Sequence, residues 1–170
     1  LWEGPNGEMP ESGCCTASDS EDARKVASKL DIPYYVLDYT ESFSKNVVDN
    51  FTQMYAQGLT PNPCVECNRS VKFDHFINQA KKLNCDKVAT GHYAKIIKKN
   101  DKYELHKADF LDKDQSYVLH MLQSSDLENI TFPLGEISKP EVRQIAARIG
   151  LRTAFKKDSQ DICFVGKKDY

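Results

Sequence analysis

Two cysteines in one short motif carry the most reactive chemistry of this sequence. Cys64 and Cys67 lie in the run Pro61-Asn62-Pro63-Cys64-Val65-Glu66-Cys67-Asn68. We expect the rigid Pro-Asn-Pro segment to place Cys67 at the start of a helix, where free backbone N–H groups and the helix dipole stabilise a thiolate. The thiolate is the form of cysteine that attacks electrophiles, so Cys67 is a candidate nucleophile.

The same spacing fits two other kinds of site. Half of a zinc site would need a second pair of ligands, but Cys14 and Cys15 are adjacent and Cys85 is solitary. A redox pair of the thioredoxin type would follow a strand, whereas this motif follows a helical pattern and a proline-rich loop. Spacing alone therefore leaves a reactive cysteine and a metal ligand both open.

A further cysteine stands near the end of the chain. Cys163 lies between Ile162 and Phe164, which is typical of a small core residue. The polar run Lys156-Lys157-Asp158-Ser159-Gln160 before it is unusual for a plain core strand and favours the edge of a site.

Two other segments could contact a ligand. Ala89-Thr90-Gly91-His92 reads as a strand that ends in glycine, and the carboxyl edge of a parallel sheet is where α/β folds bind nucleotides. Lys113-Asp114-Gln115-Ser116-Tyr117 combines charged, amide, hydroxyl and aromatic groups that suit RNA. The alternatives are a tight turn with a surface histidine, and an exposed helix start with Tyr117 packed inward.

Hydrophobic periodicity predicts the elements that position these residues. Helices are expected from Ser18, where Ser18 and Glu21 form a capping box, and over 41–57, 68–83, 113–123 and 139–149. Strands are expected at 34–39 (buried), 86–90 and 162–165, with a hairpin of 93–97 and 102–106 around Asn100-Asp101. This alternation predicts an α/β layer fold with a parallel sheet.

Composition sets the outer limits. The chain has 170 residues, 40% hydrophobic and 28% charged, which suits one globular domain or at most two. A net charge of −2 excludes a basic nucleic-acid coat, and the four lysines within 95–102 are either a solvated surface or a local contact. No apolar run approaches the length of a membrane span. Six irregularly spaced cysteines favour a reducing compartment, and a first residue other than Met suggests a fragment.

Taken in order, the motifs resemble the tRNA-specific 2-thiouridylase family (MnmA/TrmU). The resemblance rests on the segments 60–68, 71–73, 89–94, 113–117, 132–135, 139–143, 156–160 and 162–164, with Gly13-Cys14-Cys15 in addition. It implies an adenine-nucleotide alpha-hydrolase-like (ATP pyrophosphatase) fold, an incomplete parallel sheet flanked by helices. Residues 1–125 would be the remainder of the catalytic domain, and 126–170 a helical continuation that carries the second catalytic cysteine toward a tRNA-binding region.

The resemblance also implies an activity, the 2-thiolation of uridine 34 in tRNAs for Lys, Glu and Gln. ATP, with Mg, would adenylate the C2 oxygen, and a persulfide donor or relay protein would supply sulfur. Cys163 would carry the persulfide, and Cys67 would be the nucleophile that releases sulfide or attacks the persulfide and forms a transient disulfide with Cys163. Gly91 would contact ATP, and the target base or tRNA would be contacted by Asn62, Pro63, Cys64, His92, Lys113, Asp114 and Gln115.

Two departures from the family pattern matter. The sequence lacks the Ser-Gly-Gly-x-Asp-Ser pyrophosphate loop and the C-terminal β-barrel, so we expect this fragment to bind ATP poorly and to be inactive alone. Many members carry Asp where Cys64 stands and others carry Cys, which leaves the general acid or base unassigned. No resident metal is expected.

Three alternatives stay open. Cys64, Cys67 and Cys163 could hold an iron–sulfur cluster. The chain could be a cysteine-rich metal-binding module without catalysis. A different adenylating enzyme is disfavoured, because its chemistry needs no paired cysteines. The expected compartment is the cytoplasm, or the mitochondrion in a eukaryote.

Overall fold

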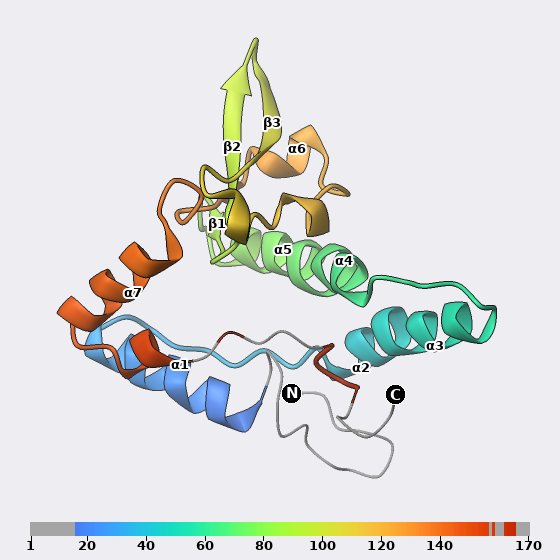
Figure 1. The fold of residues 1–170 in the computed structure, drawn as a ribbon, viewed down its shortest axis with the longest axis horizontal. Helices are drawn as coiled ribbons and strands as arrows, with labels where there is room; N and C mark the ends of the chain where they lie inside the picture. The colour runs from blue at the N-terminus through green and yellow to red at the C-terminus, as the bar shows by residue number, and fades with distance from the viewer. Residues whose placement is uncertain (1–15, 157, 159–161, 166–170) are drawn as a thin grey trace. The chain divides into compact units, whose positions relative to one another are not determined.

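The computed structural model describes residues 16–156, 158 and 162–165 (Figure 1). They fall into two compact units. The first takes in the described parts of 1–63 and 146–170, and the second spans 64–145. Helices dominate both units, and one small parallel sheet lies in the second, so the expected α/β class is confirmed. The functional division at residue 125 stays a prediction.

The first unit begins with α1 (Ala17–Lys29). The helix was predicted correctly, but its cap lies two residues earlier than expected. The Thr16 hydroxyl accepts a hydrogen bond from the Asp19 amide at 3.1 Å, and the Asp19 carboxylate accepts one from the Thr16 amide at 3.0 Å. Thr16-x-x-Asp19 thus supplies the reciprocal capping pattern before Ser18 is reached.

A long helix follows in the same unit. It consists of α2 (Thr40–Phe43), the π-helical segment Ser44–Val48 and α3 (Asp49–Ala56), which confirms the helix predicted over 41–57. Gly58 then adopts φ +76°, a left-handed conformation that glycine takes without strain and that ends the helix.

Two strands predicted for this unit are wrong. Residues 34–39 form no strand, and Tyr35 and Val36 are 73% and 61% exposed. Residues 162–165 form a turn in which the Val165 amide donates to the Ile162 carbonyl at 3.2 Å. Aromatic and β-branched residues fit a half-buried pleated surface, but a strand also needs a neighbouring segment to complete its hydrogen bonds.

The second unit is built on another long helix. It consists of α4 (Pro63–Glu66), the π-helical segment Cys67–Phe73 and α5 (Asp74–Lys82). It starts five residues earlier than predicted, because proline is tolerated at the first helical position. Its Phe73 joins a core that also contains Ala94, Val118, Leu119, Ile130 and Phe132.

The parallel sheet consists of β1 (Val88–Ala89) and β4 (Ile130–Thr131), with Val88 opposite Ile130. The predicted hairpin is confirmed as β2 (Ala94–Lys99) and β3 (Lys102–Lys107). Asn100 and Asp101 adopt φ of 49° and 60°, as a two-residue type I′ turn requires.

The remaining elements are 3₁₀ turns and two further helices. The helix predicted over 113–123 is wrong, because 3₁₀ turns at Leu111–Lys113 and Ser116–Val118 replace it and α6 (Ser124–Leu127) follows. The last predicted helix is confirmed as α7 (Lys139–Arg148), and a 3₁₀ turn occupies Arg152–Phe155. Among the described residues, no helix combines the length and apolarity that a bilayer crossing requires.

Candidate active site

The helix that starts at Pro63 positions both motif cysteines. Cys64 lies exposed in the first turn, whereas the half-buried Cys67 lies in the second. The expectation that Cys67 stands at the helix start is therefore wrong. Because the dipole effect falls off within the first turn, it favours the Cys64 thiolate more than that of Cys67. The charge of nearby Arg69 is offset by Glu66, which it contacts at 2.5 Å.

Asn68 fastens the cysteine segment to the rest of the second unit. Its side chain is buried, with 2% of the residue exposed, and its Nδ2 donates to the Val118 carbonyl at 3.4 Å. Its Oδ1 has no hydrogen-bond partner within the described part of the chain. The π-helical turns directly after Cys67 are thus held by a buried amide, and such turns are frequent at functional sites.

His92 follows the carboxyl end of β1 and lies against the cysteine helix. It is 9% exposed, and its ring centroid lies 5.9 Å from that of Phe73 and 6.0 Å from that of Phe132. Its Nδ1 lies 2.8 Å from the Thr90 hydroxyl, and either atom can donate. Burial, helped by the charge of Lys72, lowers the pKa of His92 to about 4. The imidazole is therefore neutral near pH 7, suited to hydrogen bonding rather than to pairing with phosphate.

The predicted RNA segment is joined to the residue after His92. The backbone N–H of Gln115 donates to the Tyr93 carbonyl at 2.8 Å. The backbone N–H of Tyr93 donates in turn to the side-chain oxygen Oε1 of Gln115 at 3.1 Å. Asp114 accepts from the Ala108 amide at 2.8 Å and from the Ser116 hydroxyl at 2.7 Å. Burial acts to raise the pKa of Asp114, but these hydrogen bonds hold it below its usual value.

These bonds explain why the predicted helix is missing there. Side-chain oxygens of Asp114 and Gln115 bind backbone amides of other segments, which is an alternative to helical hydrogen bonding. Both residues therefore stabilise the fold of the second unit. The half-buried Lys113 lies in the same segment, and tRNA contacts by Lys113, Asp114 and Gln115 stay a prediction.

Gly91 fits a nucleotide site at the edge of the sheet. It is exposed, and a Cβ there would meet only Leu134 Cδ1, at the ordinary contact distance of 3.8 Å. Nothing in the described structure therefore requires glycine, whereas close approach of a ligand to the backbone would. Gly135 is the opposite case, since its Cβ would overlap the Ala94 carbonyl and packing alone requires glycine.

Cys163 belongs to the first unit, where Phe164 anchors it. The Phe164 ring packs edge-on against Phe43 and Phe51, with centroid distances of 5.8 and 5.4 Å. Lys156, seven residues earlier in the sequence, contacts Asp19 at 2.6 Å and Asp22 at 2.7 Å through its Nζ. Lys156 and Phe164 therefore both contact helices of this unit.

The other predicted residues lie in three places. The exposed Asn62 and the buried Pro63 precede Cys64 where the chain leaves the first unit, and Cys67, Gly91 and His92 lie in the second. Because Cys163 lies in the other unit, its pairing with Cys67 stays a prediction. Gln160, Lys157 and Cys14 fall outside the described residues.

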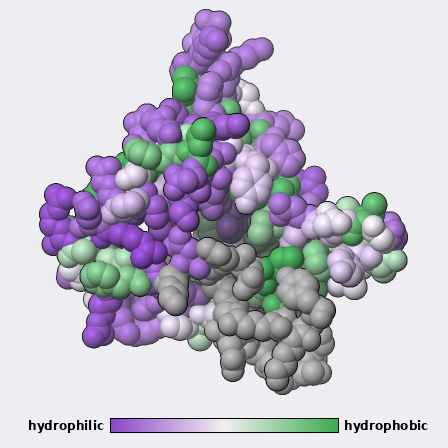
Figure 2. Space-filling model, viewed as in Figure 1, coloured by the Kyte–Doolittle hydropathy of each residue, from purple (hydrophilic) through white to green (hydrophobic). Residues whose placement is uncertain are grey.

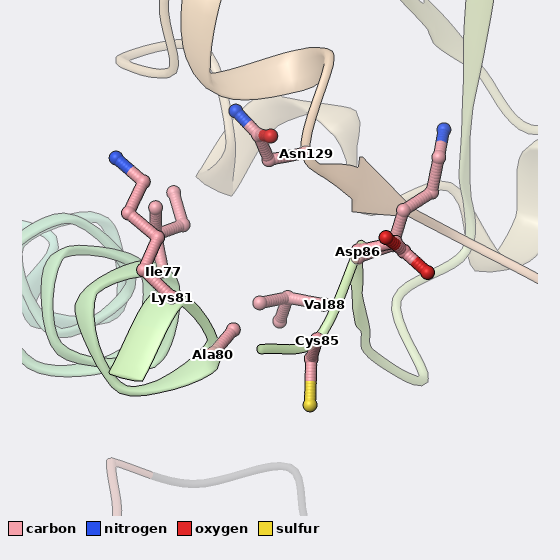
Figure 3. A pocket seen from close by; sticks show the side chains of 8 residues that line it. Ile77, Ala80, Lys81, Cys85, Asp86, Val88 and Asn129 are labelled. Atoms are coloured by element: carbon pink, nitrogen blue, oxygen red, sulfur yellow. The ribbon is translucent and has the colours of Figure 1, made fainter. Parts of the chain in front are cut away.

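No metal centre accompanies these residues in the described ranges. Across them, no three His, Cys, Asp or Glu side chains gather where a metal ion could bind. Figure 3 shows a small hollow between α5 and β1, lined by Ile77, Ala80, Cys85 and Val88 among others. Its volume of about 10 Å³ admits one water at most, so it is no substrate site.

Comparison with known proteins shows the family to which the chain belongs. Residues 1–167 match the family model described as the tRNA methyl transferase HUP domain. The chain belongs to this family. HUP domains form the adenine-nucleotide alpha-hydrolase-like class and use ATP, which agrees with the resemblance noted from the motifs.

Relatives of this HUP domain carry a more specific name. It is 48% identical over 171 residues to the tRNA-specific 2-thiouridylase MnmA of Chloroflexus aurantiacus (strain J-10-fl), covering 100% of this chain and 48% of the relative. It is 47% identical over 171 residues to that of Clostridium botulinum (strain Eklund 17B), covering 100% and 47%. The match to that of Clostridium perfringens (strain 13) is 47% over 166 residues, covering 97% and 46%. The chain thus spans about half the length of the curated relatives it matches.

Sequence reasoning gave no role to two residues that support this site. Asn68 and Thr90 both lie inside the quoted motifs, but their hydrogen bonds to Val118 and His92 depend on the tertiary structure. The signal available was polarity beside a candidate site residue, since each stands within two residues of one.

Proposed function

We propose that this protein takes part in the 2-thiolation of the wobble uridine, U34, of tRNA. The observation that carries the proposal is its match, over the whole chain, to relatives named tRNA-specific 2-thiouridylases. The chain also supplies the two thiols, Cys67 and Cys163, that a sulfur relay needs. The substrates would be tRNAs for Lys, Glu and Gln in the cytoplasm.

Bound ATP, with Mg, would supply the adenylyl group that converts the C2 oxygen of uridine into a leaving group. Gly91 would let the nucleotide lie close to the backbone, because this position is exposed and carries no side chain. The target base must leave the anticodon stack to reach such a site. Asn62, Pro63 and Cys64, at the start of the cysteine helix, are the proposed contacts with that base.

Cys163 would receive sulfur from a persulfide donor as Cys163–S–SH. Its terminal sulfur forms a bond to C2 while the C2–O bond breaks and AMP leaves. The Cys67 thiolate then attacks Cys163 Sγ, which breaks the persulfide S–S bond and leaves its electron pair on the tRNA sulfur. The product is a Cys67–Cys163 disulfide, which a dithiol reductant must reduce before the next turnover.

The departure of AMP from C2 is not assisted by a protonated histidine. His92 is neutral near pH 7, so it can orient a ligand but has no charge to stabilise AMP. Cys64 is exposed in the first turn of the helix, one turn before Cys67. We infer that the Cys64 thiol takes the place of the acidic residue that many family members carry there.

The test is the mobility of tRNA on a mercury-containing gel after reaction of the full-length protein with ATP and a persulfide donor. Thiolated tRNA is retarded, whereas a methylated uridine is not. Cys67→Ser and Cys163→Ser should each abolish retardation and keep tRNA binding, while Cys85→Ser, an exposed control, should react normally. Unretarded tRNA with the wild-type protein would refute the proposal. Stoichiometric iron that is lost on replacing Cys64 would favour the iron–sulfur alternative.

A further inference from the structure

The β2–β3 hairpin ends in a pair of lysines that the fold does not use. Lys99 and Lys102 are cross-strand partners directly beside the Asn100-Asp101 turn. Both are exposed, and within the described part of the chain neither ammonium group has an acidic partner. Like charges directly opposite each other destabilise a hairpin. This pair therefore lowers the stability of the hairpin, and no ion pair in the described structure compensates for it.

The neighbouring lysines differ because they are engaged. Lys95 forms an ion pair with Asp109, and Lys98 contacts Asp101 at 3.6 Å and lies 5.6 Å from the centroid of the Tyr103 ring. The register places Lys98 and Tyr103 on one face of the hairpin and Lys99 and Lys102 on the other. The unengaged charge is thus concentrated on one face at the tip.

The hairpin extends this charge away from the body of the second unit, as Figure 1 shows, and its outer end is strongly hydrophilic in Figure 2. A strand advances about 3.4 Å per residue, so Lys99 stands about 17 Å along β2 from Ala94. His92 and Tyr93 directly precede β2, and Gln115, which follows β3 in the chain, is bonded to Tyr93. The base of the hairpin therefore adjoins the residues proposed to contact tRNA, and its tip reaches several base pairs farther.

We propose that Lys99 and Lys102 bind the phosphate backbone of the tRNA substrate in a stem region away from the reacting base. The inference rests on the proposed function and adds a second point of contact to it. Lysine is a flexible point charge that suits phosphates and carries no sequence information. A paired helix of RNA is recognised mainly through its shape and backbone, which a narrow, projecting arm can reach.

An acidic protein, such as a sulfur donor, would be the competing partner for the same charges. The position of the hairpin favours RNA, because its strands begin and end beside the proposed tRNA contacts. An arm about 17 Å long that starts there extends naturally along a bound stem. The choice between the two partners is decided by the experiment.

The experiment compares tRNA binding by the full-length protein with that of two double variants, at several salt concentrations. In Lys99→Gln/Lys102→Gln, two phosphate contacts are lost. The slope of log Kd against log salt should fall by about 1.5, and affinity near 0.1 M salt should drop roughly 10-fold. The matched control Lys81→Gln/Lys82→Gln removes the same charge from an exposed pair at the end of α5 and should keep the wild-type slope.

Two further readouts separate the outcomes. Thiolation at saturating tRNA should keep its kcat while KM for tRNA rises, and thermal stability should not fall, because a repulsive pair has been removed. An unchanged salt slope in the hairpin variant would overturn the inference, and so would normal tRNA binding with slower sulfur delivery by a donor protein. Failure of the wild-type protein to bind or thiolate tRNA would instead refute the proposed function.

Discussion

Replacing His92 with glutamine should remove a large part of the protein's loss of stability in mild acid. The pKa of this imidazole is about 4 in the folded protein, mainly because of burial, against its ordinary value of 6.5. Between these two values the unfolded chain binds the proton more readily than the folded chain does. Stability from this residue is therefore complete above pH 6.5 and is lost as the pH falls toward 4.

The magnitude follows from the same two values. The full difference corresponds to about 3 kcal/mol, of which about 2 kcal/mol is lost between pH 7 and pH 5. With a urea m-value of about 2 kcal/mol/M, the unfolding midpoint should fall by about 1 M over that interval. In His92→Gln the amide can still bind the Thr90 hydroxyl but does not titrate, so this part of the shift should vanish.

The assay is urea unfolding of the wild-type protein, His92→Gln and His120→Gln at pH 7 and pH 5. His120 is exposed, so His120→Gln is the matched substitution of a histidine outside the core. Equal losses of stability in the wild-type protein and in His92→Gln would refute the reasoning, because they would show that this imidazole is not kept neutral by the fold.

Three other substitutions test the proposed nucleotide contact, the packing at Gly135 and the anchoring of Cys163. In the full-length protein, Gly91→Ala should leave the unfolding free energy within about 0.5 kcal/mol but weaken ATP binding roughly 10-fold by calorimetry; unchanged ATP affinity would contradict its role. Gly135→Ala should cost about 1–3 kcal/mol in thermal unfolding, because the new Cβ meets the Ala94 carbonyl, and a neutral result would contradict that packing. Phe164→Ala should cost about 1–2 kcal/mol and slow sulfur transfer, whereas Phe155→Ala, at an exposed position, should do neither.

Local signals accounted for most of the elements. The helix over 41–57, the one after Ser138 and the hairpin around Asn100-Asp101 were all predicted, because periodicity, capping and turn residues act within a few positions. The Ser138 hydroxyl, for example, accepts from the Glu141 amide at 3.3 Å as its spacing indicates.

Two of the errors have a different cause, because the outcome depended on contacts outside the pattern that was analysed. Residues 34–39 have strand composition, but no described segment pairs with them. The helix predicted from Lys113 does not form. Instead, Asp114 accepts a hydrogen bond from the Ala108 amide, and Gln115 accepts one from the Tyr93 amide. Neither partner could be read from local propensity.

By itself the sequence determined the chemistry on offer, namely two cysteines, a glycine at a strand end and a histidine beside it, in an order typical of one family. Only the tertiary structure decided how those groups are held. It buried His92 until its charged form became unfavourable, and it packed Phe164 against Phe43 and Phe51. The reason is that reactivity depends on desolvation and neighbouring charge, and both arise from contacts between segments far apart in the chain.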